Sequence, residues 1–180
     1  MLTVANLQPN IVLGDNILSL APELLIQHDI RGLILDVDET LVPFKRREVS
    51  QELKKWIEEI RQVADIWLVS NNLSRNRIGN IAKELNVPYL AAARKPSRRK
   101  LKIAAQAMNL PPKQIAMVGD RLFTDVLAGN RLGMFTILVE PMLEAGKSNK
   151  GFYPIRDFEV WLSQMLGVSL GSAQKKFTKY

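Results

Sequence analysis

Four carboxylates are spaced along this chain so that they could act together on a phosphate. Asp36 and Asp38 follow one apolar run directly, and Asp120 and Asp125 follow another. Carboxylates gathered in one crevice raise one another's pKa unless a cation neutralises them. Oxygen ligands suit Mg²⁺, which binds one or two carboxylates together with a substrate phosphate. One carboxylate could then attack phosphorus while a second transfers the proton.

Hydrogen-bond donors follow two further runs and could hold a phosphoryl group. Ser70 and Asn71 come after one of them, and Lys95 closely follows the next. Each residue also has an ordinary interpretation: a turn for the first aspartate pair, a helix cap for Ser70, a solvated charge for Lys95. Asp125 could be only an acid favoured at the start of a helix. The combination favours catalysis, because several separate segments supply complementary groups.

The elements that must position these residues alternate between strand and helix. Short apolar runs predict five strands: Gly32 to Leu35, Asp65 to Val69, Tyr89 to Ala91, Ile115 to Val118 and Phe135 to Val139. Apolar residues at helical spacing predict four helices: Ser50 to Val63, Ile78 to Leu85, Arg98 to Met108 and Thr124 to Leu132. This order predicts a doubly wound α/β domain with a mainly parallel sheet of about five strands. Ligands bind beyond the carboxyl ends of such strands, where the polar residues should meet.

In the order in which they occur, these motifs resemble those of the haloacid dehalogenase-type phosphatases. The pattern DxDxT is met by Asp36 to Thr40, the second motif by Ser70, the third by Lys95, and GDxxxxD by Gly119 to Asp125. The surroundings of Ser70 and of the last motif resemble the YqeG-like subfamily (subfamily IIIA). That subfamily is similar to the phosphatidylglycerophosphate phosphatases of mitochondria and plastids. The segments between the motifs are too short to hold a large cap domain.

The resemblance implies a role for each matching residue. Asp36 would be the nucleophile and Asp38 the general acid and base, with the main-chain carbonyl of Asp38 on the metal. The implied site comprises catalytic Asp36 and Asp38, phosphate-binding Ser70, Asn71 and Lys95, magnesium ligands Asp36, Asp38 and Asp120, and supporting Thr40 and Asp125. The expected activity is Mg²⁺-dependent hydrolysis of a phosphomonoester through an aspartyl-phosphate. The expected substrate is phosphatidylglycerophosphate, which would yield phosphatidylglycerol.

Two alternatives to this function stay open on the sequence alone. The chain could be a soluble phosphatase of the same type that acts on a sugar phosphate or a nucleotide. It could also be a non-catalytic binding module that keeps the fold and holds a partner through its basic face. The presence of every expected reactive residue favours the enzyme. Neither the physiological substrate nor the oligomeric state follows from the residues.

Composition limits the remaining classes. The 180 residues fit one domain, and the absence of cysteine excludes disulfides, Cys-ligated zinc and thiolate catalysis. A net charge of +7 favours anionic partners. The basic run from Arg94 to Lys102 suggests an anionic lipid or substrate, and its lack of interleaved aromatic residues argues against nucleic acid.

Location and domain organisation are expected from the same patterns. No run of 18 uncharged apolar residues and no signal-peptide pattern is present, so we expect a cytoplasmic protein, with peripheral membrane contact left open. We expect three parts: an N-terminal docking segment at 1–30, the phosphatase domain at 31–165, and a basic C-terminal tail at 166–180.

Overall fold

The apolar runs of the sequence form a sheet of six parallel strands in the order β1-β6-β5-β2-β3-β4. The computed structural model describes residues 4–43, 46, 48–142, 159, 161, 165 and 167–170. The strands are β1 (Ile11–Val12), β2 (Gly32–Leu35), β3 (Asp65–Val69), β4 (Tyr89–Leu90), β5 (Ile115–Gly119) and β6 (Phe135–Leu138). The two central strands, β2 and β5, are buried along their whole length, as a strand covered on both faces must be.

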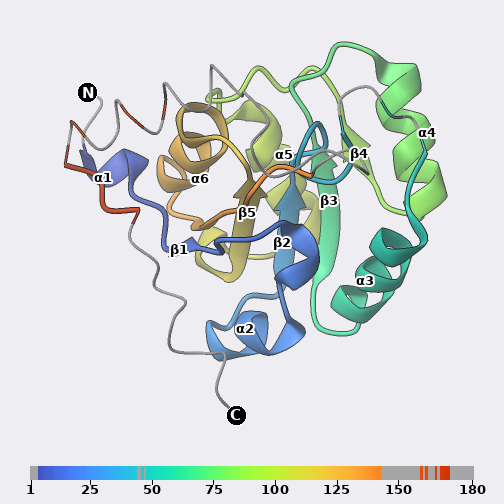
Figure 1. Cartoon of the computed structure of the whole chain (residues 1–180), viewed down its shortest axis with the longest axis horizontal. Coiled ribbons are helices and arrows are strands. Elements are labelled where there is room, and N and C mark those ends of the chain that lie inside the picture. Colours follow the sequence, from blue (N-terminus) through green and yellow to red (C-terminus); the bar gives the residue numbers. More distant parts are fainter. Residues whose placement is uncertain are drawn as a thin grey trace.

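Helices cover both faces of this sheet (Figure 1). They are α1 (Val4–Leu7), α2 (Pro22–Gln27), α3 (Gln51–Arg61), α4 (Arg75–Leu85), α5 (Arg99–Met108) and α6 (Leu127–Asn130), with short turns η1 (Ile17–Ser19), η2 (Pro112–Gln114) and η3 (Leu122–Val126). Ser50 begins α3 by accepting a 3.1 Å hydrogen bond from the backbone nitrogen of Leu53. Both α4 and α5 end at an asparagine with positive φ, a conformation that asparagine tolerates at a helix end.

The alternation of side chains along β2 explains the two layers of helices. Leu33 and Leu35 face the larger core cluster, which contains Ile57 of α3 and Ile81 of α4. Ile34 faces the opposite way, into the cluster that contains residues of α5 and α6. Apolar groups therefore leave water on both faces of the sheet. The polar loops at the strand ends are left to carry the chemistry.

The fold class expected from the sequence is confirmed, and the sheet has one strand more than expected. The additional strand, β1, pairs with β6 and lies within the segment expected to be a docking segment. That segment also sends side chains into the protein core, namely Leu7, Leu13, Ile17, Leu20, Leu25 and Ile30. Asn130 of α6 binds it further, since its side-chain amide donates to the carbonyls of Asn6 and Gln8 at 3.0 and 2.9 Å.

The last expected helix and the expected C-terminal tail can each be compared with the structure only in part or with a difference. The helix expected from Thr124 to Leu132 begins as a π-helical turn, η3, continues as α6, and gives way at Gly133, which has a φ of +71°. Of the expected tail at 166–180, only residues 167–170 belong to the described part of the chain. None of the helices among the described residues has the length and apolar character needed to cross a bilayer.

Candidate active site

Acidic residues from two neighbouring strands converge on one buried lysine. Asp36 follows β2, Asp120 follows β5, and Asp125 lies in η3, yet each places a carboxylate oxygen within 4.8 Å of the other two. The ammonium of Lys95, which follows β4, lies 2.6 Å from Oδ1 of Asp36 and 2.7 Å from Oδ1 of Asp125. The side chain of Lys95 is 1% exposed, so these ion pairs are shielded from solvent.

The charge balance of this centre leaves a place for a divalent cation. When ionised, the three carboxylates carry three negative charges against one positive charge on Lys95, which leaves two uncompensated. Burial is the largest influence on Asp36 and raises its pKa to about 7, although Lys95 opposes the shift. Burial and the neighbouring carboxylates, Asp125 first, also raise the pKa of Asp120 well above its usual range. Hard oxygen donors with this charge fit Mg²⁺.

Local contacts fix the two carboxylates after β5. The hydroxyl of Thr40 donates to Oδ1 of Asp120 at 3.2 Å. Oδ2 of Asp125 accepts from the backbone nitrogen of Arg121 at 3.3 Å, which closes the turn that begins η3. A Cβ atom on Gly119 would lie 2.3 Å from that same Oδ2, so only glycine lets Asp125 approach the strand. These contacts give a physical reason for the glycine and the threonine of the sequence motifs.

Asp38 lies beside this centre with a set of partners of its own. Its Oδ2 accepts from the hydroxyl of Ser70 at 3.4 Å and from the amide of Asn72 at 3.0 Å. Its Oδ1 forms an ion pair with Arg77, from the first turn of α4. Arg77 also donates to the carbonyl of Arg46 at 3.1 Å and so joins α4 to the loop that follows Asp38. The carboxylate of Asp38 is therefore held from three directions.

The loop that carries Lys95 is fastened to the loop after β3. The side chain of Asn71 accepts from the backbone nitrogen of Lys95 at 2.6 Å and donates to its carbonyl at 3.1 Å. Backbone nitrogens of Ala92 and Ala93 donate to the carbonyls of Asn72 and Ser70, both at 2.9 Å. The position of Lys95 thus depends on residues of the second motif as well as on its own loop.

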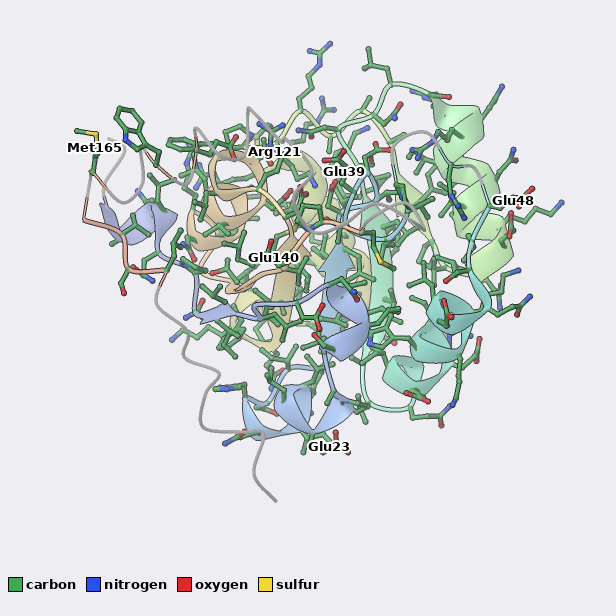
Figure 2. The ribbon with its side chains drawn as sticks, viewed as in Figure 1. Glu23, Glu39, Glu48, Arg121, Glu140 and Met165 are labelled. Atoms are coloured by element: carbon green, nitrogen blue, oxygen red, sulfur yellow. The ribbon has the colours of Figure 1, made fainter. Side chains whose placement is uncertain are left out.

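The whole arrangement lies at one edge of the sheet. Figure 2 shows Glu39 and Arg121 beyond the carboxyl ends of β2 and β5, at the opposite end of the sheet from Glu23 in α2. Glu39 adopts a φ of +64°. This left-handed conformation turns the chain sharply between Asp38 and Thr40.

The structure brings all the residues of the expected site to this edge, but the side chains that group together are not those expected to bind the metal. Among the described residues, the three-carboxylate group contains Asp125 in place of Asp38, whose side chain binds Ser70, Asn72 and Arg77. Because the side chain of Asp38 has these partners, we expect Asp38 to bind the metal through its main-chain carbonyl. The side chain of Asn71 contacts Lys95, so a phosphate contact would fall to its backbone nitrogen. The individual roles stay predictions.

Sequence reasoning missed Arg77 altogether and did not assign Asn72 to the site. Asn72 carried a signal, since it directly follows the second motif and could have been predicted to face the same crevice. Arg77 carried none that separates it from Arg75, which also belongs to the first turn of α4. Only the packed positions of side chains show which arginine reaches Asp38.

The raised pKa of Asp36 predicts a pH-dependent stability of the metal-free protein. A carboxyl whose pKa rises on folding, here from 3.8 to about 7, keeps its proton in the folded state after the unfolded chain has lost it. The free energy of unfolding should therefore fall as pH rises from about 4 to about 7, by a few kcal/mol from this group, and then level off. Urea unfolding in EDTA measures the fall, and added Mg²⁺ should remove most of it. A flat or rising profile in EDTA would contradict the prediction.

Comparisons with known proteins place these features in context. Residues 3–143 match the family model described as mitochondrial PGP phosphatase. A curated relative, "Probable phosphatase YqeG" of Bacillus subtilis, is 38% identical over 71% of this chain and 74% of its own length. A chloroplastic phosphatidylglycerophosphate phosphatase 1 of Chlamydomonas reinhardtii is 30% identical over 74% of this chain. The match spans 53% of that algal protein, and 38% of the chloroplastic/mitochondrial counterpart from Arabidopsis thaliana.

Solved structures share the fold at low sequence identity. An uncharacterized protein from Listeria monocytogenes aligns with a TM-score of 0.52 and 16% identity, over 77% of this chain and 99% of that one. A "putative HAD family hydrolase" from Streptomyces avermitilis aligns with a TM-score of 0.52 and 17% identity, over 82% and 90%. At this identity the likeness concerns the arrangement of strands and helices.

Proposed function

Since this chain belongs to the mitochondrial PGP phosphatase family, we propose that it removes the terminal phosphate of phosphatidylglycerophosphate, with Mg²⁺ and through an aspartyl-phosphate. It is a phosphatase of the haloacid dehalogenase superfamily, and its substrates are phosphorylated compounds. The finer points, namely the metal, the covalent intermediate and the lipid substrate, constitute the proposal. The observation that carries it is the buried meeting of Asp36, Asp120, Asp125 and Lys95 at one sheet edge.

Asp36 and Asp38 are suited to the two halves of such a reaction. In the first half, a carboxylate oxygen of Asp36 forms a bond to phosphorus as the bond to the leaving oxygen breaks. Asp38, oriented by Arg77 and Asn72, gives that oxygen a proton. In the second half, Asp38 takes a proton from water. The water oxygen then displaces Asp36 from phosphorus, which releases inorganic phosphate.

The remaining residues would hold charge. Lys95 neutralises part of the negative charge on the phosphoryl group while keeping Asp36 in place, and Ser70 donates a hydrogen bond to a phosphoryl oxygen. Asp36, Asp120 and the main chain of Asp38 would hold Mg²⁺. When bound, Mg²⁺ supplies positive charge that offsets the repulsion between carboxylates and phosphate.

The assignment of substrate rests on the relatives and on an open site. Two relatives are described as phosphatidylglycerophosphate phosphatases, and the family model carries the same activity in its description. The segments 41–65 and 72–95, where a cap domain would be inserted, are too short to hold one. A site without a cap can meet a phosphate that stays attached to a membrane lipid.

The deciding experiment measures phosphate release by the full chain from a panel of substrates. The panel contains phosphatidylglycerophosphate in mixed micelles, a sugar phosphate and a nucleotide, each with Mg²⁺ and with EDTA. We expect the highest kcat/KM with the lipid and no turnover in EDTA. A higher kcat/KM with a soluble phosphate would contradict the lipid assignment. Absence of turnover throughout, with Mg²⁺ present, would favour a binding module.

Arg77 gives a separate prediction about proton transfer. If Arg77 orients Asp38, then Arg77→Ala should slow the hydrolysis of phosphomonoesters that have a poor leaving group. The hydrolysis of those with a good leaving group should be slowed far less. A nitrophenolate leaves without a proton, whereas an alkoxide needs one. We expect kcat for an alkyl phosphate to fall roughly 100-fold or more, and kcat for p-nitrophenyl phosphate to fall by less than about tenfold.

A matched control for this prediction lies two residues away. Arg75 is exposed and belongs to the same helical turn, so Arg75→Ala removes the same charge and should leave both rates unchanged. Arg77→Lys should recover part of the alkyl phosphate rate. Equal losses on the two substrates in Arg77→Ala would mean that Arg77 supports the fold alone.

A further inference from the structure

A cluster of exposed or partly buried cations stands on the rim of the site and takes no part in the proposed chemistry. It consists of Arg75 at the start of α4, Arg94 in the loop after β4, and Arg99 and Lys100 at the start of α5. Three separate segments thus deliver positive charge to the edge at which the strands end. We call these four residues the rim cluster.

Contacts within the edge show that the rim cluster borders the catalytic groups. Arg94 directly precedes Lys95, the partner of Asp36. The ammonium of Lys100 binds the carbonyl of Ala91, in the stretch that pairs with the loop after β3. The pKa of Lys100 lies below its usual range, through partial burial first and then through the charges of Arg75, Arg99 and Arg94. The cations are therefore near enough to repel one another.

Among the residues that the structure describes, no ion pair is formed by any member of the rim cluster. Cations elsewhere on the surface do have acidic partners, such as Lys54 with Glu84 and Arg31 with Asp29. The rim cluster thus keeps its repulsion uncompensated within the described part of the chain. A surface of this kind gains from an anionic partner.

An exposed leucine stands beside the cations. Leu73 is 75% exposed, follows Asn72 of the site directly, and lies two residues from Arg75. Solvent exposure of a leucine is common by itself. Its place among cations that form no ion pair with another described residue, at the mouth of a phosphatase site, gives the rim both an apolar and a cationic character. This combination matches the interface of an anionic bilayer, where basic groups meet headgroups and an apolar side chain enters the acyl boundary.

We propose that the rim cluster and Leu73 form a docking surface for an anionic phospholipid bilayer, which sets the catalytic edge against the membrane. The proposal rests on the proposed function in one respect, since a lipid phosphate must be reached in its bilayer. A nucleic acid is the less suitable occupant, because none of the five described residues that form the surface is an aromatic on which a base could stack.

Vesicle binding by the full chain tests the surface without recourse to catalysis. Wild type and a patch variant, Arg75→Gln/Arg94→Gln/Arg99→Gln, are floated with vesicles of phosphatidylcholine alone or with added phosphatidylglycerol. At low salt each lost charge should weaken binding to the anionic vesicles about fivefold, or on the order of 100-fold together. Leu73→Ser should also weaken binding, and lower salt should not restore it. Activity on p-nitrophenyl phosphate should stay unchanged in both variants.

A control variant separates this surface from net charge. Arg31→Gln/Lys55→Gln/Lys113→Gln removes three exposed cations away from the rim, and it should bind anionic vesicles as wild type does. Equal weakening of the control and patch variants would overturn the proposal. Failure of wild type to prefer anionic vesicles would overturn it too, as would tighter binding to single-stranded RNA through the same arginines.

The two proposals fail in distinguishable ways. If wild type binds anionic vesicles through the rim cluster but leaves phosphatidylglycerophosphate intact, the substrate assignment fails and the docking surface stands. If the patch variant hydrolyses the lipid in vesicles as fast as wild type does, the docking surface fails and the substrate assignment stands.

Discussion

Substituting asparagine for Asp36 should reduce turnover of every phosphomonoester by roughly 10⁴-fold or more, because a neutral amide oxygen is far too weak a nucleophile to replace the attacking carboxylate. Asparagine has the same shape, and its carbonyl oxygen can still accept the hydrogen bond from Lys95. The binding geometry should therefore survive while the nucleophile is lost. Initial rates with p-nitrophenyl phosphate and with the lipid substrate measure the effect.

The same substitution should stabilise the metal-free protein. Burial and neighbouring carboxylates disfavour the charge on Asp36 and raise its pKa to about 7. At pH 8 the folded state therefore contains an ionised carboxylate in an unfavourable environment. Neutral asparagine removes that charge, and we expect the free energy of unfolding in EDTA to rise by about 1–3 kcal/mol. Activity and stability would then move in opposite directions, as expected for a residue kept for chemistry.

A control variant and a chemical measurement test whether Asp36 is the nucleophile. Asp29→Asn makes the same change at an exposed residue before β2 and should alter neither activity nor stability appreciably. Mass spectrometry of acid-quenched wild type should place the covalent phosphoryl group on the peptide that contains Asp36. A phosphoryl group on any other residue, or substantial turnover by Asp36→Asn, would remove Asp36 as nucleophile.

The sequence was most informative where one local pattern determines the structure. β2 and β3 have the bounds that their apolar runs predicted, and Asp36 and Ser70 follow them directly as a consequence. In a parallel sheet the carboxyl ends of all strands lie at the same edge, so Lys95 and Asp120 could be placed there from the strand order alone. Motif spacing and fold topology sufficed for these residues.

Features that depend on distant partners could not be read in this way. β1 has only two residues, and its partner β6 lies more than a hundred residues further along the chain. Arg77 of α4 contacts Asp38 from 39 residues further along the chain, and no motif spacing predicts this contact. On sequence alone, Asp125 could be either an acid favoured at the start of a helix or a residue that supports the metal site. Its carboxylate lies 2.7 Å from the ammonium of Lys95, a contact that motif spacing does not reveal.

Lys95 leads to the second large prediction, which concerns charge balance. In Lys95→Met, the carboxylates of Asp36 and Asp125 lose their buried ammonium partner. Removing one member of a buried ion pair costs about 3–5 kcal/mol because the other charge stays buried and unpaired. We therefore expect the free energy of unfolding to fall by this amount at pH 8 in EDTA, as measured by urea unfolding. Turnover should fall roughly 10²–10³-fold or more, since a cation that faces the phosphoryl group disappears.

The loss of stability should depend on pH in a definite direction. Without Lys95 the pKa of Asp36 rises further, because Lys95 no longer opposes the effect of burial, so the folded state holds a proton that the unfolded chain has released. The penalty should therefore be small near pH 4, where Asp36 stays protonated in the folded state, and should grow as pH rises toward 8. Mg²⁺ should relieve part of it by supplying positive charge. Lys113→Met, an exposed change at the opposite edge, should show none of this dependence.

A double variant separates charge balance from catalysis. Lys95→Met/Asp125→Asn removes one positive and one negative charge, so two negative charges remain in excess, as in wild type. We expect stability at pH 8 to recover most of what the single variant lost, while turnover stays low because no ammonium faces the phosphate. Recovery of both properties would mean that Lys95 serves only to neutralise Asp125. Recovery of neither would mean that the packing of Lys95, rather than its charge, holds this edge together.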